Sequence, residues 1–220
     1  MEDDYTIIFK YEFESGLGPM EYARYLREFK MNILARDEFS NEEKLIGKVI
    51  FKVIYLDQAM NNEIDIMEVF DDEEYTFRHG QDFFDFETEE IKEDIQKFYQ
   101  YDIIGSNICI LENIEIIPEF RGNNLAAKAI KDIIFHFSSA CGLFVIQPYP
   151  LQFDLTHQGK DDWDKNLKLN EFPSDKEVAF KKLRKYYKSF GFDQIRGYKD
   201  LFFYNPTRNN EKLDAINLEE

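Results

Sequence analysis

The sequence predicts a mixed α/β fold in which helices flank one central sheet. Three observations predict this class. A run rich in β-branched residues, 107–117, leads through a short polar turn into a helical pattern that starts at Leu125. An uncharged run, 143–147, follows that helix and has the character of a buried parallel strand reached by a right-handed crossover. Phenylalanine and tyrosine are abundant, with 22 and 13 residues, which favours a sheet with an aromatic core.

Length and composition predict one folded domain over residues 1–220. The chain is 44% hydrophobic and 32% charged, which is typical of a globular protein with a real core. A net charge of −17 argues against a nucleic-acid partner and against an anionic membrane surface. No apolar run approaches the ~20 residues of a membrane helix, and the acidic start lacks the pattern of a signal peptide. We therefore expect a cytoplasmic protein.

The N-terminal half predicts a strand, a helix and a second strand. Residues 5–13 have the pattern of a strand, and residues 20–33 place Tyr22, Tyr25, Leu26, Phe29 and Ile33 on one helical face. Residues 45–56 are dense in β-branched side chains and predict a long strand. The segment from about 58 to 100 is expected to form two acidic, mainly helical pieces around a turn at 85–88, with its carboxylates on a solvated face.

The strand at 107–117 carries two acids of interest. Four residues are expected to share one of its faces: Ile108, Ile110, Ile114 and Ile116. Glu112 interrupts that face, and Glu115 lies on the opposite one. A carboxylate in a central strand is costly to bury unless it is paired or neutral, so both are candidate proton acceptors. The alternative, that each acid is simply exposed at the strand end, stays open.

The polar turn after this strand predicts an anion site. A strand that runs into a helix N-terminus leaves several backbone N–H groups pointing at one spot, and a diphosphate fits there. Gly122 lets the backbone approach a ligand, and Asn123 or Asn124 is a plausible N-cap. Asparagine is also the non-glycine residue that best tolerates a left-handed turn. The alternative is a strand–turn–helix unit with no ligand.

The C-terminal part predicts a loop, a helix and two short strands. Residues 151–173 have little pattern and contain the only tryptophan, Trp163, and His157. A loop that leaves the carboxyl end of a central strand can line a ligand site, although Trp163 could equally be a packing anchor. Ser174 opens a capping box before a helix that extends to Phe190, and short strands are expected at 192–198 and 201–204. The thiols of Cys109 and Cys141 have no metal-like spacing and are expected to be buried and free.

Two of these segments resemble the GCN5-related N-acetyltransferase superfamily. The run Arg-Gly-Asn-Asn-Leu-Ala at 121–126, after Ile-Ile-Pro-Glu-Phe, resembles the acyl-CoA loop of that superfamily, whose pattern is Arg/Gln-x-x-Gly-x-Gly/Ala. Asn124 departs from the pattern because it stands where the middle glycine is expected. The run Lys-Tyr-Tyr-Lys-Ser-Phe-Gly-Phe at 185–192 resembles the Tyr-x-x-x-Gly-Phe signature of the last helix and strand.

The resemblance implies a fold, a cosubstrate and an acceptor. The fold would be a mostly antiparallel mixed sheet with a splayed parallel strand pair, and 151–173 would be an insertion into it. Acetyl-CoA would be the cosubstrate, an unidentified primary amine the acceptor, and no metal would take part. The resemblance implies these cosubstrate-binding residues: Ile114, Ile116, Ile117, Arg121, Gly122, Asn123, Asn124, Leu125 and Ala126.

The resemblance also implies catalytic roles. Glu112 or Glu115 would accept the proton of the amine, and Tyr187 would protonate the leaving thiolate, with Tyr186 as its rival. Two other functions stay open: an inactive member of the fold that serves as a CoA-binding or protein-interaction module, and an α/β protein that binds another phosphorylated ligand. The oligomeric state is also open, and a homodimer is compatible with the sequence.

Overall fold

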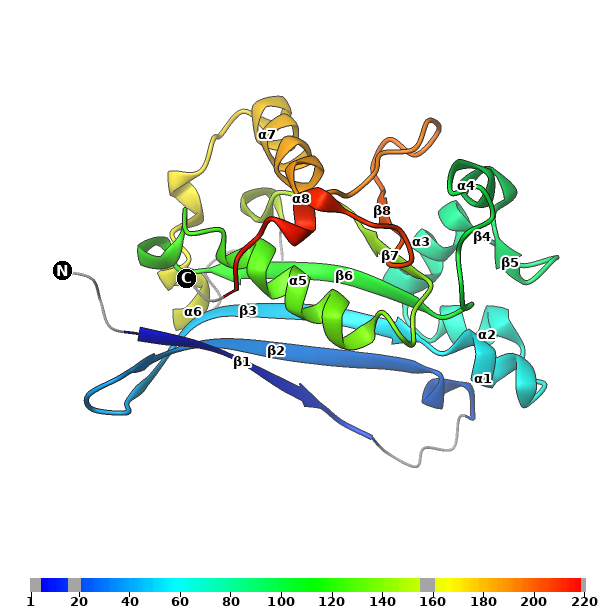
Figure 1. Cartoon of the computed structure of the whole chain (residues 1–220), viewed down its shortest axis with the longest axis horizontal. Coiled ribbons are helices and arrows are strands. Elements are labelled where there is room, and N and C mark those ends of the chain that lie inside the picture. The colour runs from blue at the N-terminus through cyan, green and yellow to red at the C-terminus, as the bar shows by residue number, and fades with distance from the viewer. Residues whose placement is uncertain (1–4, 16–20, 155–160, 219–220) are drawn as a thin grey trace.

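A six-stranded mixed sheet forms the centre of the computed structural model, which describes residues 5–15, 21–154 and 161–218. The strand order is β1-β2-β3-β6-β7-β8 (Figure 1). The strands are β1 (Tyr5–Phe13), β2 (Leu26–Asp37), β3 (Glu43–Ile54), β6 (Ile108–Ile116), β7 (Leu143–Ile146) and β8 (Phe202–Tyr204). Strands β6 and β7 run parallel, and every other neighbouring pair in this sheet is antiparallel. The predicted mixed, mostly antiparallel sheet with a parallel pair is confirmed.

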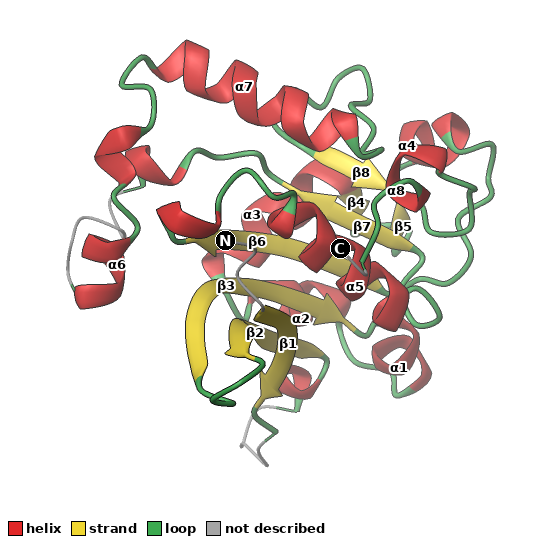
Figure 2. Cartoon of the chain, turned by 60° about the vertical axis from the view of Figure 1, so that its left-hand side comes forward, coloured by secondary structure: helices red, strands yellow, loops and turns green. Residues whose placement is uncertain are grey.

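Helices cover both faces of the sheet (Figure 2). On one face lie α5 (Leu125–Phe137), α7 (Lys176–Ser189) and α8 (Glu211–Asp214). On the other lie α1 (Leu56–Asn61), α2 (Ile66–Asp71), α3 (Glu74–Phe83) and α4 (Glu93–Phe98), with the small hairpin β4 (Phe84–Asp85) and β5 (Glu90–Ile91). A further short helix, α6 (Asp162–Asn166), lies in the segment between β7 and α7.

Each face has its own apolar core. The first core joins α5 and α7 to β2, β3 and β6, and its centre is an aromatic cluster in which the ring centroids of Phe29, Phe51 and Phe137 lie 5.0–5.1 Å apart. The second core lies between α1–α4 and the strands β6, β7 and β8, and it buries Phe70, Phe83 and Phe203 completely. Cys109 and Cys141 are buried and free, as the sequence predicts.

The predicted helix at 20–33 is wrong in the part that the structure describes. A single 3-10 turn, η1 (Tyr22–Arg24), is followed by the long strand β2. The apolar residues from Phe29 onward fit the period of a helix and also that of a strand. In the structure Phe29, Met31 and Ile33 are buried at every second position, as in a strand. Pairing with β1 on one side and β3 on the other stabilises the extended form. Met20 lies outside the described residues.

The other predicted elements are close to those observed. The acidic segment is mainly helical, but it forms four short helices and a hairpin rather than two pieces. Its turn exists: the Asp85 carboxylate accepts hydrogen bonds from the Glu87 and Thr88 N–H groups. Helix α7 is capped by Asp175 rather than by Ser174. Of the two C-terminal strands, the first is reduced to an isolated bridge between Asp193 and Phe203.

A β-bulge divides β6 into two parts. Ile50 pairs with Asn113 and Phe51 with Leu111, so Glu112 is the extra residue without a partner on β3. Ile108 and Ile110 therefore pack in the second core, whereas Ile114 and Ile116 pack against the first. The expectation that all four isoleucines share one face is wrong, because the extra residue reverses the alternation.

Gly142, which precedes β7, is expected to tolerate no side chain. A Cβ atom there would lie 2.1 Å from the Gly105 carbonyl oxygen and 2.6 Å from that of Ile104, and neither backbone atom can move freely. We expect Gly142→Ala to lower the free energy of unfolding by about 3 kcal/mol, measured by urea titration. Gly197→Ala is the control, because Gly197 has φ +105° but nothing within 4 Å, so the strained backbone alone costs about 1 kcal/mol. Equal losses for the two variants would contradict the contact.

Candidate active site where β6 and β7 separate

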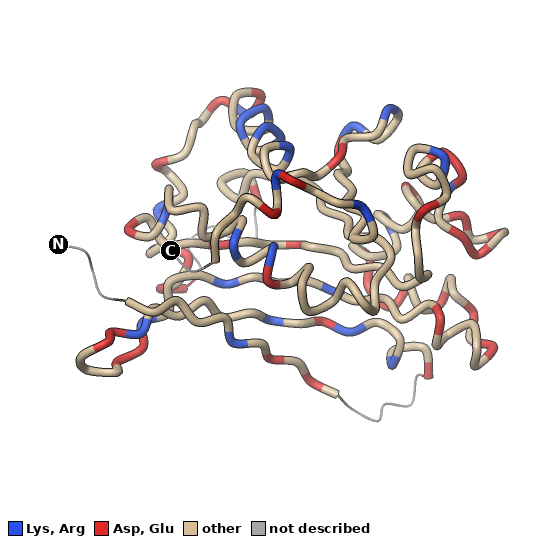
Figure 3. Tube along the Cα trace, in the orientation of Figure 1, with Lys and Arg blue, Asp and Glu red and all other residues tan. Residues whose placement is uncertain are grey.

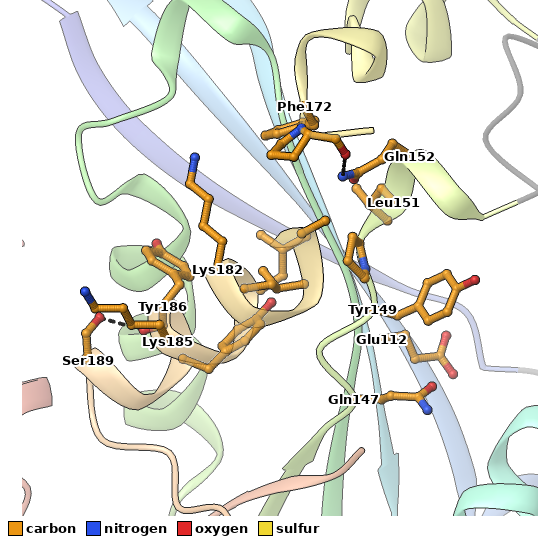
Figure 4. Close-up of a pocket in the computed structure, with 16 residues that line it drawn as sticks. Glu112, Gln147, Tyr149, Leu151, Gln152, Phe172, Lys182, Lys185, Tyr186 and Ser189 are labelled. Atoms are coloured by element: carbon orange, nitrogen blue, oxygen red, sulfur yellow. Dashed lines mark hydrogen bonds between the residues drawn. The ribbon is translucent and has the colours of Figure 1, made fainter. Parts of the chain in front are cut away.

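The parallel pair β6–β7 opens at the bulge. The first pair of residues is Ile108 with Leu143, and the last is Leu111 with Ile146. Beyond it, β6 continues past Glu112, while β7 ends before Gln147 and Pro148. A central cavity of about 540 Å³ lies at this opening. Figure 4 shows Glu112, Gln147 and Tyr149 at one end of it and Tyr186 and Lys182 of α7 at the other.

Two more cavities adjoin the central one. A loop cavity of about 370 Å³ lies at the start of α5, and it shares Ile114, Phe172 and Tyr186 with the central cavity. An outer cavity of about 560 Å³ lies toward α3, and it shares Glu112 and Gln147 with the central cavity. The three cavities therefore adjoin one another in a row, here called the path, from the turn before α5, past the opened strands, to α3.

The loop cavity contains most of the residues that the sequence predicts for the cosubstrate. It is lined by seven of the nine: Ile114, Ile116, Arg121, Gly122, Asn124, Leu125 and Ala126. The other two are not among its lining residues. Ile117 is buried in the first core and donates its N–H to the Ile46 carbonyl at 3.0 Å. Asn123 is exposed in the turn.

The turn has the backbone conformation that its residues permit. Gly122 has φ +92°, and a Cβ atom added there would meet nothing within 4 Å, so the space beside its backbone is open. Asn124 has φ 54° and ψ 18°, a left-handed conformation that asparagine tolerates. Asn124 occupies the N-cap position of α5, but its side chain makes no capping hydrogen bond. Leu125 and Ala126, at the start of this 13-residue helix, line the loop cavity, and Asn124 caps none of the helix N–H groups.

Arg121 stabilises the loop rather than offering its charge to the cavity. Its Nε donates to the Ile116 carbonyl at 2.9 Å, and a terminal nitrogen donates to the Leu167 carbonyl. The guanidinium also lies over the Phe172 ring, 4.4 Å from its centroid. Burial lowers its pKa. Arg121 thus ties the turn to β6 and to the segment before α7.

Helix α7 supplies positive charge next to the path. Figure 3 shows the blue stretch along this helix in an otherwise largely acidic chain. It carries Lys176, Lys181, Lys182, Arg184, Lys185 and Lys188, against a single acid, Glu177. Lys182 lines both the loop cavity and the central cavity. A polyanionic ligand in the loop cavity would therefore lie beside Lys182.

Glu112 is the predicted acid that reaches the cavities. Its carboxylate lies 2.7 Å from the Nζ of Lys52, which is 4% exposed and also contacts Glu73. Burial raises the pKa of Glu112, and the hydrogen bond and charge of Lys52 oppose that rise. For Lys52, burial lowers the pKa, but the two carboxylates outweigh it and the net pKa is raised. Glu112 is thus a largely buried carboxylate, 15% exposed, next to a fixed cation.

Glu115 lies away from the cavities. It is 5% exposed, so the alternative of an exposed acid is wrong for this residue. Its carboxylate accepts a hydrogen bond from the Trp163 Nε1 at 2.6 Å, and Lys48 lies over the Trp163 ring at 4.4 Å. Trp163 is therefore an anchor of the segment, and Glu115 is its partner. His157 lies outside the described residues.

The segment at 151–173 lines the path through other residues. Leu151 lines all three cavities, and Phe172 lines two of them. Phe153 and Asp154 line the outer cavity. The expectation that this segment borders a ligand site agrees with these positions, although Trp163 is not the residue that does so.

The two tyrosines of α7 differ in position. Tyr187 is 7% exposed, lines the central cavity and packs in the first core, where its ring meets Phe190 and Phe192. Burial raises its pKa, and Tyr186 and Tyr75 raise it further. Burial also raises the pKa of Tyr186, but the Ala127 N–H, directed at its hydroxyl, opposes the rise. Tyr186 thus lies at the start of α5, whereas Tyr187 lies toward Tyr75 of α3.

Sequence reasoning missed several residues of the path, among them Tyr75, Gln147 and Lys182, and also Lys52, the partner of Glu112. One of them carried a usable signal. Lys52 is a lone charged residue between Phe51 and Val53 in an apolar stretch, and a buried lysine needs an acid. Tyr75 carried none, because only the packing of α3 against the sheet brings it near Glu112.

Comparison of the chain with protein-family models, curated proteins and solved structures gave no match. Within the described ranges, no helix combines the length and the apolar content that crossing a bilayer requires. The same residues contain no group of three or more His, Cys, Asp or Glu side chains arranged to hold a metal ion.

Proposed function

We propose that the chain is an acetyl-CoA-dependent N-acetyltransferase that acts on a primary amine. One observation carries the proposal: adjoining cavities extend from the start of α5, past the separated ends of two parallel strands, to the Glu112 carboxylate and the Tyr187 phenol. An acetyl-CoA enzyme needs these parts to bind the diphosphate, to hold the pantetheine arm and to transfer the acyl group. The motif resemblance at 121–126 and 185–192 supports the same function.

The N–H groups at the start of α5 would bind the diphosphate, with Lys182 beside them. The pantetheine arm would lie along β6 beyond the bulge, next to Ile114. Ile116 is less available as a backbone partner, because its carbonyl already accepts from Arg121. The thioester would then reach the central cavity between Glu112 and Tyr187.

Transfer would proceed through a tetrahedral intermediate. The amine nitrogen attacks the thioester carbonyl carbon, and its proton passes to Glu112, directly or through water. The C–S bond breaks as the carbonyl re-forms, and the thiolate takes the phenolic proton of Tyr187. Because the pKa of Tyr187 is raised, this phenol is protonated at neutral pH and can donate a hydrogen bond to the thiolate as it forms. Glu115 takes no part, since it lies outside the path.

Calorimetric titration with acetyl-CoA, CoA and ADP tests the first half of the proposal. We expect both CoA species to bind and ADP to bind more weakly. An amine panel with thiol release as the readout tests the second half. No binding of either CoA species would overturn the proposal, and CoA binding without turnover would favour a regulatory module instead.

Tyr187→Phe is expected to lower kcat about 100-fold while CoA affinity changes little, because only the proton donor is lost. Tyr186→Phe tests the rival tyrosine, and Tyr101→Phe, at an exposed site, is the matched control. Full activity of Tyr187→Phe would exclude its role as the acid.

kcat/KM should fall as pH is lowered through the pKa of Glu112, because a base must be ionised to accept a proton. Burial raises this pKa above its ordinary value.

A further inference from the structure

The outer cavity differs in character from the rest of the path. The loop and central cavities are lined mostly by apolar side chains between α5, α7 and β6. The outer cavity has seven polar lining residues and two apolar ones, Leu151 and Phe153. Its polar residues are Tyr75, Arg78, Glu112, Asn113, Gln147, Tyr149 and Asp154. A cavity with charges of both signs fits a small ligand that itself carries both signs.

Arg78 is the only cation among these lining residues. It is exposed on α3, and in the described parts of the chain it forms no salt bridge and no side-chain hydrogen bond. The other cation nearby, Lys52, is already neutralised by Glu112 and Glu73. Arg78 is thus the group that can bind an anion in this cavity without breaking an existing pair.

The charged groups of the outer cavity lie around the phenol of Tyr75. Burial raises its pKa; Glu112 raises it further, Arg78 lowers it and Asp154 raises it. Each of these groups is therefore close enough to the phenol to act on it, although the cavity itself is the primary observation. The phenol also lies toward Tyr187, whose pKa it raises. Tyr75 lines the outer cavity, and Tyr187 lines the central cavity that adjoins it.

We propose that the outer cavity binds an acceptor that carries both a primary amine and a carboxylate, as a free amino acid does. The carboxylate would pair with Arg78, and the amine would lie at Glu112, at the boundary with the central cavity. This inference rests on the proposed acetyltransferase function and names its acceptor class. An acceptor with only positive charge fits less well, because the cavity holds a cation that such an amine would avoid.

The test uses pairs of compounds that differ only in the carboxylate: L-phenylalanine with phenethylamine, L-histidine with histamine, and L-lysine with cadaverine. We expect kcat/KM for thiol release from acetyl-CoA to be at least tenfold higher for the amino acid of a pair. Arg78→Gln should remove most of that difference. It should lower kcat/KM for the amino acid and leave kcat/KM for the amine within about threefold of the wild-type value. Arg196→Gln, an exposed arginine of the loop before β8, is the matched control and should change neither.

Binding is measured separately, by saturation-transfer NMR on the same pairs with CoA present, so the result does not depend on turnover. Preferential binding of the amino acids that Arg78→Gln abolishes would support the assignment even if no acetylation occurred, in which case only the enzymatic proposal would fail. Equal binding and equal turnover within each pair, a preference for cadaverine, or equal losses for both members in Arg78→Gln would overturn the acceptor class. Acetylation of the amines alone would leave the acetyltransferase proposal standing.

Discussion

Replacing Lys52 by methionine is expected to lower the free energy of unfolding by about 3–5 kcal/mol at pH 7, because it removes one partner of a buried ion pair. The ammonium is almost fully buried in β3 and contacts both Glu112 and Glu73. Glu73 can be hydrated when its partner is lost, since its side chain is 39% exposed. Glu112 can be hydrated only in part, since its side chain is 15% exposed, and its carboxylate would lose the cation that offsets its burial.

The loss in Lys52→Met should depend on pH. Burial already raises the folded-state pKa of Glu112, and removing Lys52 removes the group that opposes the rise. A carboxyl whose folded pKa exceeds its unfolded value takes up its proton first in the folded state as pH falls. The destabilisation should therefore be smaller at pH 5 than at pH 7.

Urea unfolding at both pH values measures the effect of Lys52→Met. The double variant Lys52→Met/Glu112→Gln should recover most of the loss, because the uncompensated charge is gone. Lys30→Met is the matched control: Lys30 lies on β2, is 63% exposed and pairs only with Glu28 at the surface, so little change is expected. A loss in Lys52→Met no larger than that in Lys30→Met would show that the buried pair does not exist in solution.

His79 predicts the second large effect, a loss of stability in mild acid. The ring is 3% exposed on α3 and packs edge-on against Tyr75 at 4.3 Å, and neither nitrogen has a hydrogen-bond partner of normal geometry among the residues that the structure describes. Its pKa is lowered to about 4, chiefly by burial and also by Arg78, while Asp82 and the nearby Gln147 oppose the change. The folded protein therefore keeps His79 neutral where the unfolded chain has already protonated it.

The folded pKa of His79 lies below the unfolded value, so the stability it contributes is present above about pH 6.5 and is lost as pH falls toward 4. The loss amounts to about 2 kcal/mol at pH 5. His79→Leu fills the site with an apolar side chain and should remove this part of the pH dependence. We expect the variant to match the wild type at pH 8 and to be the more stable protein at pH 5, as measured by urea unfolding. The same slope between pH 8 and 5 for both proteins would contradict the buried neutral histidine.

The sequence was most informative where local pattern and tertiary role coincide. The run from β6 through the turn to α5 and β7 has β-branched residues, a glycine and asparagine turn and a helical stripe in the places where the fold uses them. Glu112 and Tyr187 could be selected for the same reason, since a lone acid in a strand and a tyrosine before Gly191 each stand out. Both line the central cavity.

The rest depended on contacts that no local pattern carries. The stretch after Tyr22 fits a helical face and a strand alternation about equally, and long antiparallel pairing decides for the strand. The bulge adds one residue to β6, which periodicity cannot reveal in advance. Tyr75 and Arg78 reach the outer cavity only because α3 packs beside the open end of β6 and β7.

The separation of β6 and β7 connects cavities on opposite faces of one sheet, and this has a kinetic consequence. A donor that enters beside α5 and an acceptor that enters beside α3 would not obstruct each other, so both can be bound when the acyl group moves. Initial velocities measured against both reactants should then give intersecting reciprocal plots, the mark of a ternary complex. Parallel plots would indicate instead that the acyl group first rests on the protein.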